Sequence, residues 1–373
     1  MARAYLDHAS TSPLRPAAAE AMAACLRAPD GDPGRIHQEG LAARVAVEQA
    51  REQVAALVGA RPREVVFTSG ATESIATAIH GATARGTHQV LPAVEHSAVR
   101  EAAACAGEVT IVEVDGRGRC DVDGVLGAVR PVTGLVHVQW GNHEVGTVQP
   151  VGEVVEACRE RGVLVHVDAA QAAGHVPIDF DSLGADLLSL SAHKLGGPPG
   201  IGALLVRRGV RLPALLLGGD QERARRAGME NVPAIVGFGV AAAELADAGV
   251  LDREARDARR LTDRVLSSAA LLEGVRPYGD LDRRLPHLVC LGIDGVEPQA
   301  VLLGLDQRGV AAHSGSACSS EALEPSPVLE AMGVDAHRSL RISTGWSSTD
   351  TDIDLLLREL PAVIEGLRSL SGG

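Results

Sequence analysis

The chain has 373 residues, of which 46% are hydrophobic and only 2% aromatic, and its formal net charge is −13 from 35 basic and 48 acidic side chains. This length can bury a large core and allows roughly two or three domains. The acidic balance argues against a nucleic-acid partner or an anionic membrane surface, and the scarcity of aromatic residues argues against a platform that stacks bases.

The N-terminus has no apolar signal segment. The apolar stretch from Ala234 to Val250 is interrupted by Glu244 and Asp247, and it is too short to span a bilayer. We therefore expect a soluble, cytoplasmic protein with no membrane partner.

Short β-branched runs alternate with alanine-rich helical patterns from residue 64 onward. The predicted strands, in chain order, are Glu64–Phe67, Gln89–Leu91, Val109–Val114, Leu135–Trp140, Val163–Val167, Leu187–Leu190 and Gly202–Val206. The predicted helices between them are Ala71–Ala84, two segments that begin at Ser97 and Val122, and Val151–Arg161. This alternation predicts an α/β fold with a doubly wound, mostly parallel sheet.

The pattern changes near Leu251, where charged residues become frequent. The elements predicted from here on are a helix over Asp252–Leu266, strands near Val289–Gly292 and Gly309–Ala312, and a terminal helix over Asp350–Leu370. Such a succession is typical of a smaller α+β domain. We predict a large domain over residues 15–245 and a small domain made of residues 1–14 and 246–373.

A lysine follows the predicted strand Leu187–Leu190, in the run Ser191-Ala192-His193-Lys194, and a loop rich in Gly and Pro comes after it. A lysine at a strand end can be desolvated, which lowers its pKa and favours a Schiff base. The neighbouring hydroxyl and imidazole groups can hold a phosphate. Pyridoxal phosphate (PLP) needs both features, although the motif alone also fits a surface lysine in a turn.

Other polar side chains follow the predicted strands, at the edge where open α/β sheets bind ligands. Thr72 opens a helix whose free N–H groups can hold a phosphate, but an ordinary helix cap explains it too. Asp168 can pair with a protonated pyridine nitrogen or cap the strand end. His96 can stack on a pyridine ring or be structural, and Asn142-His143 can be a plain polar turn.

Cys318 stands apart from the other cysteines because it lies among small, hydroxyl-rich residues in the run His313-Ser314-Gly315-Ser316-Ala317-Cys318. Such a run predicts an exposed thiol on a mobile loop. A free thiol has a pKa of roughly 8.5 and needs modest activation to become a nucleophilic thiolate. His313 would activate it if protonated, but it can also be only a strand-end residue.

The other five cysteines are expected to be reduced and mostly buried. They are Cys25, Cys105, Cys120, Cys158 and Cys290. The spacing of the cysteines fits no zinc site, and no metal is predicted.

The joint occurrence of these motifs identifies a family resemblance. With Thr72, His96, Asp168, Gln171, Lys194 and Cys318 in this order, the chain resembles a cysteine desulfurase, a fold-type I PLP enzyme related to the class V aminotransferases. The resemblance runs from Tyr5 to Ser343 and is carried by the runs Ser-Gly-Ala-Thr-Glu-Ser, His-Val-Asp-Ala-x-Gln, Ser-x-His-Lys and Ser-Gly-Ser-Ala-Cys. The long cysteine loop is similar to that of the family's first group.

The resemblance implies PLP as cofactor, L-cysteine as substrate, L-alanine as product, a homodimer, and sulfur transfer from a Cys318 persulfide to an unidentified acceptor protein. It implies that Lys194 holds the cofactor and moves the substrate α-proton, that His96 stacks on the ring and shuttles protons, and that Asp168 holds the pyridine nitrogen. The further cofactor contacts that it implies are Ala71, Thr72, Asn142, His143, Gln171, Ser191 and His193. Arg341 is implied to bind the substrate carboxylate, with Asn142 beside it.

Four positions depart from the family pattern, namely Ala76, His143, Met229 and Trp346. Met229 stands where a threonine usually reaches the phosphate of the partner subunit; a thioether cannot donate that hydrogen bond, and the charge of Arg226 can compensate. The departures keep open a degenerate scaffold without activity. Independently of them, a selenocysteine lyase or another PLP lyase or aminotransferase of the same fold stays an alternative. The tail that iron–sulfur-assembly members use is missing after Leu370, which suggests a dedicated sulfur pathway for tRNA, a cofactor, DNA or a secondary metabolite.

Overall fold

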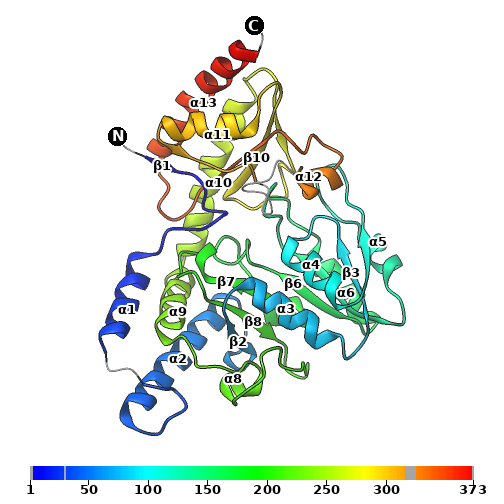
Figure 1. The fold of residues 1–373 in the computed structure, drawn as a ribbon, viewed down its shortest axis with the longest axis vertical. Coiled ribbons are helices and arrows are strands. Elements are labelled where there is room, and N and C mark those ends of the chain that lie inside the picture. Colours follow the sequence, from blue (N-terminus) through cyan, green and yellow to red (C-terminus); the bar gives the residue numbers. More distant parts are fainter. Residues whose placement is uncertain (1–2, 29–30, 316–324, 372–373) are drawn as a thin grey trace.

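The computed structural model describes residues 3–28, 31–315 and 325–371. Within these residues the strands form a seven-stranded sheet, a three-stranded sheet and one two-stranded pairing. Figure 1 shows the large sheet with its helices in the lower part of the molecule and the smaller sheet in the upper part, near both termini.

The large sheet has the strand order β2-β8-β7-β6-β5-β3-β4. Its strands are β2 (Val65–Thr68), β3 (His88–Pro92), β4 (Glu108–Val112), β5 (Thr133–Gln139), β6 (Leu164–Asp168), β7 (Leu187–Ser191) and β8 (Gly202–Val206). β8 runs antiparallel to both β2 and β7, and the remaining neighbours are parallel. The carboxyl ends of the parallel strands therefore meet at one edge of the sheet.

Helices cover both faces of this sheet and bury two separate apolar clusters. One face packs against α3 (Ala71–Ala82) and α4 (Ser97–Ala106). The other face packs against a larger set of helices, which are α1 (Pro16–Arg27), α2 (Gln38–Leu57), α5 (Val122–Ala128), α6 (Val151–Glu160) and α9 (Val232–Ala246). The core consists largely of Val, Ala and Leu, as the low aromatic content requires.

The smaller sheet is antiparallel, with the strand order β12-β10-β9. Its strands are β9 (Val275–Tyr278), β10 (Leu288–Ile293) and β12 (Ser339–Ser343). The helices of the same part of the chain are α10 (Val250–Ala269), α11 (Pro298–Gln307), α12 (Pro327–Ala331) and α13 (Asp350–Ser371). The N-terminal strand β1 (Ala4–Tyr5) pairs in parallel with β11 (Val310–Ala311), and Leu6 is buried in the same apolar cluster. The first residues of the chain thus pack with the last third of it.

Four short elements connect these parts, namely η1 (Pro62–Glu64), α7 (Phe180–Leu183), η2 (Ala192–Lys194) and α8 (Gln221–Ala224). The predicted α/β class and every predicted strand and helix are confirmed, with ends that shift by a few residues. The pattern gave no prediction for several elements, among them α1, α2, α9, α11, α12, β1, β9 and β12. The boundary between a large and a small domain stays a prediction.

No single helix in the described part of the chain is long and apolar enough to cross a membrane. The pair α9 and α10 together has the length and composition of a membrane span, but an 81° bend separates the two helices.

A row of polar side chains crosses the interior of the large sheet. His137 on β5 lies beside His166 on β6, with 3.1 Å between the two Nδ1 atoms. His137 Nε2 lies 2.8 Å from Gln89 Oε1, and His166 Nε2 lies 2.7 Å from Ser189 Oγ. Because the amide oxygen can only accept, His137 donates from Nε2, His166 donates from Nδ1, and the Ser189 hydroxyl donates to His166. Burial keeps both imidazoles neutral by lowering their pKa values, that of His166 to about 3.

A left-handed turn follows β8, at the element labelled α8 in Figure 1. Glu222, Arg223 and Ala224 have φ values of 48°, 59° and 60°, and no other non-glycine residue in the described chain has a positive φ. Such a conformation costs about 1–2 kcal/mol for each L-residue. The buried Glu222 carboxylate accepts two N–H groups of Arg51 at 2.7 Å each and the Phe67 N–H at 2.9 Å, which holds the turn in place.

Candidate active site

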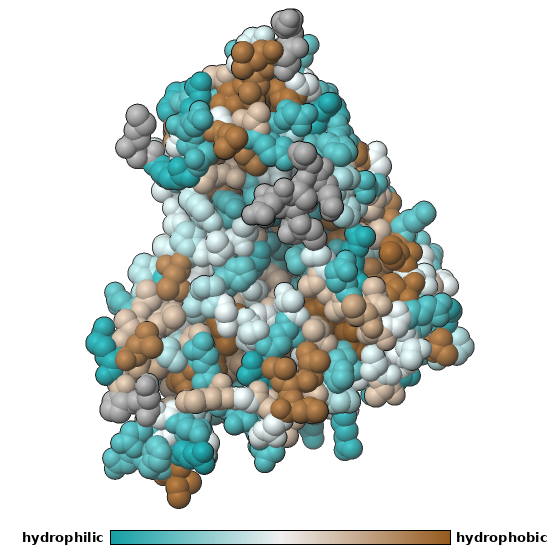
Figure 2. Space-filling model, in the orientation of Figure 1, coloured by the Kyte–Doolittle hydropathy of each residue, from teal (hydrophilic) through white to brown (hydrophobic). Residues whose placement is uncertain are grey.

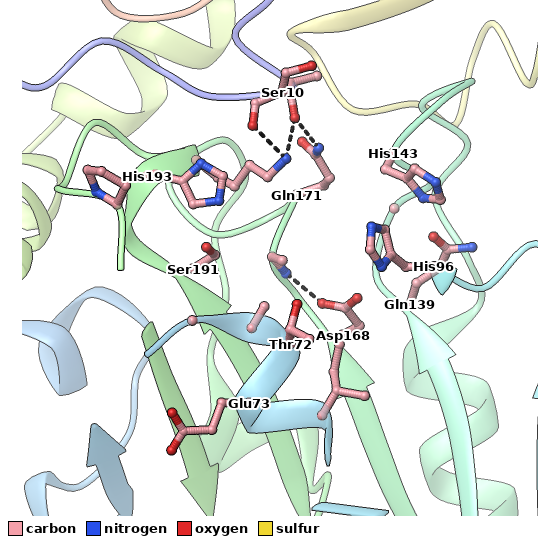
Figure 3. A pocket seen from close by; sticks show the side chains of 18 of the residues that line it. Ser10, Thr72, Glu73, His96, Gln139, His143, Asp168, Gln171, Ser191 and His193 are labelled. Carbon is pink, nitrogen blue, oxygen red and sulfur yellow. Dashed lines mark hydrogen bonds between the residues drawn. The ribbon is translucent and has the colours of Figure 1, made fainter. Parts of the chain in front are cut away.

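A cavity of about 510 Å³ lies at the carboxyl edge of the large sheet. Its walls come from both parts of the molecule, since Ala9, Ser10, His313 and Arg341 face residues of the sheet and of α3 across it. Figure 3 shows side chains from several strand ends pointing into this space, with Ser10 above and Thr72 and Asp168 below. In Figure 2 the visible coloured surface at mid-height of the molecule is mostly pale or teal, so few strongly hydrophobic residues are exposed on this face there.

Lys194 lies at the centre of the cavity wall, at the end of η2 and just beyond β7. Its Nζ donates hydrogen bonds to the backbone oxygens of Ala9 and Ser10, the latter at 3.0 Å. Burial, reinforced by the positive charge of Arg341, lowers the pKa of Lys194 to about 8, and the carboxylates of Asp7 and Asp168 oppose that shift. The amine is therefore partly neutral, and so nucleophilic, near physiological pH.

The N-terminus of α3 forms the lower wall and has the features of an anion site. The first N–H groups of a helix have no partner within the helix, and here Gly70, Ala71 and Thr72 all line the cavity. A Cβ placed on Gly70 would meet no protein atom within 4 Å, so the backbone is open to a close approach. Ser191 and His193 complete this wall from β7 and η2, and burial lowers the pKa of His193 to about 4.

Asp168 ends β6 and projects into the floor of the cavity, where its Oδ1 accepts the Ala170 N–H at 3.0 Å. Within the described residues this is the one hydrogen bond that its carboxylate receives, so the other oxygen is available to a ligand. Gln171 lies above it, donating to the Ala9 oxygen at 2.7 Å and accepting from His287 at 3.4 Å.

His96 and His143 form the opposite wall (Figure 3), with ring centroids 4.9 Å apart and an edge-to-face geometry. His96 caps α4, because its Nδ1 accepts the Ala98 N–H at 3.0 Å. Burial, and after it the charge of His143, lowers the pKa of His96 to about 4. The neutral His96 ring thus carries its proton on Nε2 and presents a flat face beside the cavity.

Arg341 enters from β12 and is almost completely buried. Its Nη2 donates to Asp7 Oδ1 at 2.9 Å and to Ser10 Oγ at 2.6 Å, and its Nη1 donates to the His143 oxygen at 2.9 Å. Its Nε is buried and has no hydrogen-bond partner in the described structure. A buried guanidinium with one unsatisfied donor suits a site that receives a carboxylate.

Asn142 is the predicted site residue that the structure does not place at the cavity. Its side chain is fully buried, donates to the Val94 oxygen at 3.2 Å, and accepts the N–H groups of Glu144 and Val145 at 2.8 Å each. The carboxamide is occupied in closing the turn after β5, so the expectation of a cofactor or substrate contact is not supported by its position. The side chain of the adjacent His143 faces the cavity instead.

Cys318 lies outside the described residues. The described chain on either side of it meets Glu144: a Cβ on Gly315 would lie 3.7 Å from Glu144 Cβ, and Ser326 Oγ donates to Glu144 Oε2 at 2.5 Å. His313 lines the cavity, its Nδ1 accepts the Gly315 N–H at 3.0 Å, and burial, followed by the charge of Arg341, lowers its pKa. These observations favour a neutral imidazole, and activation of Cys318 by His313 stays a prediction.

Among the other cysteines, Cys120, Cys158 and Cys290 are buried, as expected, and burial raises the pKa of the first two thiols to about 12 and about 11. Cys105 contradicts the expectation, because it lies on the exposed side of α4.

Sequence reasoning missed several residues of this site. Asp7 and Ser10 hold Arg341, Gln139 lines the floor, and Glu73 lines the wall at α3. Asp7 and Ser10 are more than 330 positions from Arg341, a separation at which no local pattern predicts contact. Gln139 carried a signal that could have been used, because it ends a strand on the same face as His137.

The sequence profile of the Aminotransferase class-V family matches residues 4–356. The chain belongs to that family, as the resemblance predicted. Two of its relatives are a protein named cysteine desulfurase IscS 1 from Archaeoglobus fulgidus, 40% identical over 98% of each chain, and a cysteine desulfurase from Gluconacetobacter diazotrophicus, 43% identical over 98% of this chain and 94% of the relative.

Solved structures agree with the sequence relatives. A NifS-like protein superposes with a TM-score of 0.90 at 32% identity and covers 98% of this chain and 100% of its own. The structure described as SspA in complex with cysteine has a TM-score of 0.81 at 31% identity, with 93% of this chain and 100% of its own covered. The fold is therefore that of the fold-type I PLP enzymes, as expected.

Proposed function

We propose that the protein is a PLP-dependent cysteine desulfurase, which converts L-cysteine to L-alanine and carries the sulfur away as a persulfide on Cys318. One observation carries the proposal: the desolvated amine of Lys194 shares a single cavity with a free helix N-terminus, the Asp168 carboxylate and the buried guanidinium of Arg341. Relatives named cysteine desulfurase, identical at 40% or more over nearly the whole chain, support it.

The residues that line the cavity fit PLP. The N-terminus of α3 at Ala71 and Thr72, with Ser191 and His193, would hold the phosphate. Asp168 would hold the pyridine nitrogen, His96 would stack on the ring, and Gln171 and His143 would face the ring hydroxyl. When bound, PLP supplies an electron sink that lets bonds to the substrate α-carbon break.

Lys194 anchors the cofactor and moves protons near the substrate α-carbon, because an amine with a pKa of about 8 can both accept and release a proton near neutral pH. Arg341 would bind the substrate carboxylate. Its fixed partners Asp7 and Ser10 orient the guanidinium before substrate arrives, so less conformational entropy is lost on binding.

The proposed sulfur transfer balances without an external oxidant. The thiolate of Cys318 attacks the substrate sulfur, and a new S–S bond forms as the C–S bond breaks. The electron pair of the C–S bond stays with the substrate β-carbon, which takes up a proton. The products are L-alanine and an enzyme persulfide, whose outer sulfur passes to an acceptor protein.

We also propose that the protein acts as a homodimer. Large apolar side chains are exposed along the start of α2 and in the loop after β8, including Ile36 at 89%, Leu217 at 86% and Met229 at 63%. Brown patches on the lower part of Figure 2 show exposed apolar surface of this kind. Apolar side chains gathered on one part of a surface are typical of protein interfaces. Sedimentation that shows only monomer at micromolar concentration would exclude the dimer.

The deciding experiment measures L-alanine release from L-cysteine, together with the mass of the protein after one turnover. The unmodified protein should release alanine and gain about 32 Da, roughly the mass of one sulfur atom. Cys318→Ser should show neither the alanine release nor the mass gain. Cys105→Ser is the matched control, because Cys105 is exposed and should be dispensable. Alanine release that survives Cys318→Ser would favour a lyase, such as a selenocysteine lyase, that needs no protein thiol. Formation of 3-mercaptopyruvate in place of alanine would favour an aminotransferase, and no product from the unmodified protein would favour a scaffold.

A further inference from the structure

A carboxylate stands in the wall of the cavity where the phosphate is expected. Glu73 lies in the first turn of α3, lines the cavity, and accepts the Ser69 N–H at 2.7 Å. Of the described residues that line the cavity, only Glu73 and Asp168 carry carboxylates. A carboxylate and a phosphate dianion at the same helix N-terminus repel each other and compete for the same dipole.

Arg226 neutralises this carboxylate. Its Nε donates to Glu73 Oε1 at 2.9 Å and its Nη2 lies 3.4 Å from Oε2, with the two side chains only 23% and 11% exposed. Burial alone would raise the pKa of Glu73, but the hydrogen bonds from Arg226 and Ser69 lower it below its usual value. Glu73 therefore stays ionised, and the guanidinium supplies the opposite charge at close range.

The chain around Arg226 is built to keep it there. Arg226 follows the left-handed turn at residues 222–224, whose Glu222 carboxylate is bound by Arg51 and by the backbone of Phe67 on β2. The Arg226–Glu73 pair fastens the same segment to α3. The segment is thus held at three places: the Glu222–Arg51 ion pair binds it to α2, the Phe67 N–H binds it to β2, and the Arg226–Glu73 ion pair binds it to α3 beside the anion site.

We propose that Arg226 is a positioning residue that cancels the charge of Glu73 and thereby sets the affinity of the α3 N-terminus for the phosphate group of the cofactor, with the turn at 222–224 holding Arg226 in place. This inference rests on the proposed PLP function.

The competing explanation is mechanical. Glu73 accepts the Ser69 N–H, so the Arg226–Glu73 pair could act solely by holding the start of α3 in place. The two explanations differ in one respect: loss of charge neutralisation weakens ligands that carry phosphate, whereas loss of a fastening weakens every ligand of the cavity alike.

The experiment measures binding of PLP and of pyridoxal, which lacks the phosphate, to the full chain after dialysis has removed its cofactor. Isothermal titration is carried out on the unmodified protein, Arg226→Gln, Glu73→Gln and the double variant. Arg308→Gln is the matched control, because it breaks an Arg–Glu pair of the same 2.9 Å length that joins the C-terminal end of α11 to Glu359 on α13, away from the cavity. The unfolding midpoint of each variant reports its folding.

We expect Arg226→Gln to weaken PLP binding about tenfold, equivalent to about 1.4 kcal/mol, and to leave pyridoxal binding unchanged. The double variant should return PLP binding to within about threefold of the unmodified protein. Equal weakening of both ligands, or a double variant as weak as Arg226→Gln, would overturn the inference while leaving the proposed function standing. An unmodified protein that binds neither ligand would instead refute the proposed function.

Discussion

The amine of Lys194 is held by the backbone oxygens of Ala9 and Ser10, and no side-chain carboxylate of the described residues lies within hydrogen-bonding distance of it. Carbonyl oxygens stabilise a donor without adding a full negative charge. Burial therefore dominates over attraction, and the pKa of Lys194 falls to about 8. Removing a neighbouring carboxylate should lower the pKa of Lys194 further, and removing the positive charge of Arg341 should raise it.

Uptake of PLP by the cofactor-free chain should rise with pH through a midpoint near 8, because only the neutral amine of Lys194 reacts. Asp7→Asn should move this midpoint to lower pH, since the Asp7 carboxylate raises the pKa of Lys194. The rate of reductive trapping with borohydride, measured from pH 6 to roughly pH 11, tests both statements. A midpoint near the ordinary lysine pKa would contradict them.

Arg341→Lys should lower kcat/KM for L-cysteine by about 100-fold, or about 2.7 kcal/mol. The lysine keeps the positive charge but loses the planar guanidinium, whose Nε is free to bind a carboxylate while its other nitrogens are fixed by Asp7, Ser10 and the His143 oxygen. Arg338→Lys on the surface serves as the control. If steady-state kinetics show the same loss of kcat/KM in both variants, Arg341 does not bind the substrate carboxylate.

Individual site residues could be predicted where the sequence alone fixes their place, at the ends of strands. Thr72, Asp168 and Lys194 follow β2, β6 and β7, and the topology of a parallel sheet brings such positions together. Asn142 shows the limit of this reasoning, because a strand-end amide can satisfy the local backbone instead of a ligand. Asp7 is the reverse case, a functional contact with no local signal.

At the scale of elements, the left-handed turn is the least regular piece of the chain. Its three residues are not glycines, and nothing in the run Glu222-Arg223-Ala224 distinguishes it from an ordinary helical turn. Strands made of short β-branched runs were predictable, whereas this turn depends on a partner, Arg51, that lies about 170 positions away.

Ala224→Gly should stabilise the protein by about 0.5–1 kcal/mol, because glycine adopts a φ of 60° without steric cost and the exposed methyl group contributes little packing. Ala104→Gly, at an exposed position within α4, should destabilise it by about 1 kcal/mol. Urea denaturation measures both. Two changes of the same sign would mean that the turn carries no strain.

The buried histidine row should make the sheet sensitive to acid. The pKa values of His137 and His166 are lowered by burial, so both contribute fully above pH ~6.5, their usual pKa, and lose their contribution as pH falls toward about 3. Each can reduce the unfolding free energy by up to about 1.4 kcal/mol per pH unit in that window.

Replacing both histidines with leucine should flatten the pH dependence of urea unfolding between pH 8 and pH 5, roughly the range around the histidine pKa. His337→Leu is the matched control, because His337 is exposed. A double variant whose unfolding free energy still falls as steeply as that of the unmodified protein would show that these two imidazoles are not the titrating groups.

At the scale of the whole molecule, Arg15 joins elements that lie far apart in sequence. Its guanidinium donates to Leu195 O at 3.0 Å, to Glu244 on α9 at 2.7 Å, and to Glu254 on α10 at 2.6 Å. The ring of Trp346 lies 5.7 Å from its central carbon. Trp346 is one of the departures from the family pattern, and here it packs on the arginine that connects the sheet, α9 and α10.

Arg15→Ala should reduce the unfolding free energy by about 2–3 kcal/mol, because it leaves carboxylates and the Leu195 carbonyl without their shared donor. Arg15→Lys should recover only part of this loss, since an ammonium group cannot form the same fork. Chemical denaturation measures the difference. A loss below about 0.5 kcal/mol for Arg15→Ala, which is typical of surface substitutions, would show that these contacts of Arg15 do not stabilise the fold.

The pairing of the first strand with the last third of the chain has a consequence for synthesis on the ribosome. β1 has no strand partner until β11 emerges, and Asp7 has no ion-pair partner until Arg341 follows, so residues made early must wait for residues made late. The large sheet is complete once β8 at Gly202–Val206 has been translated, and it can fold first. Ala9 and Ser10 reach Lys194 only when the N-terminal segment then packs against the later part of the chain. The catalytic cavity is therefore expected to close late in the folding of the nascent chain.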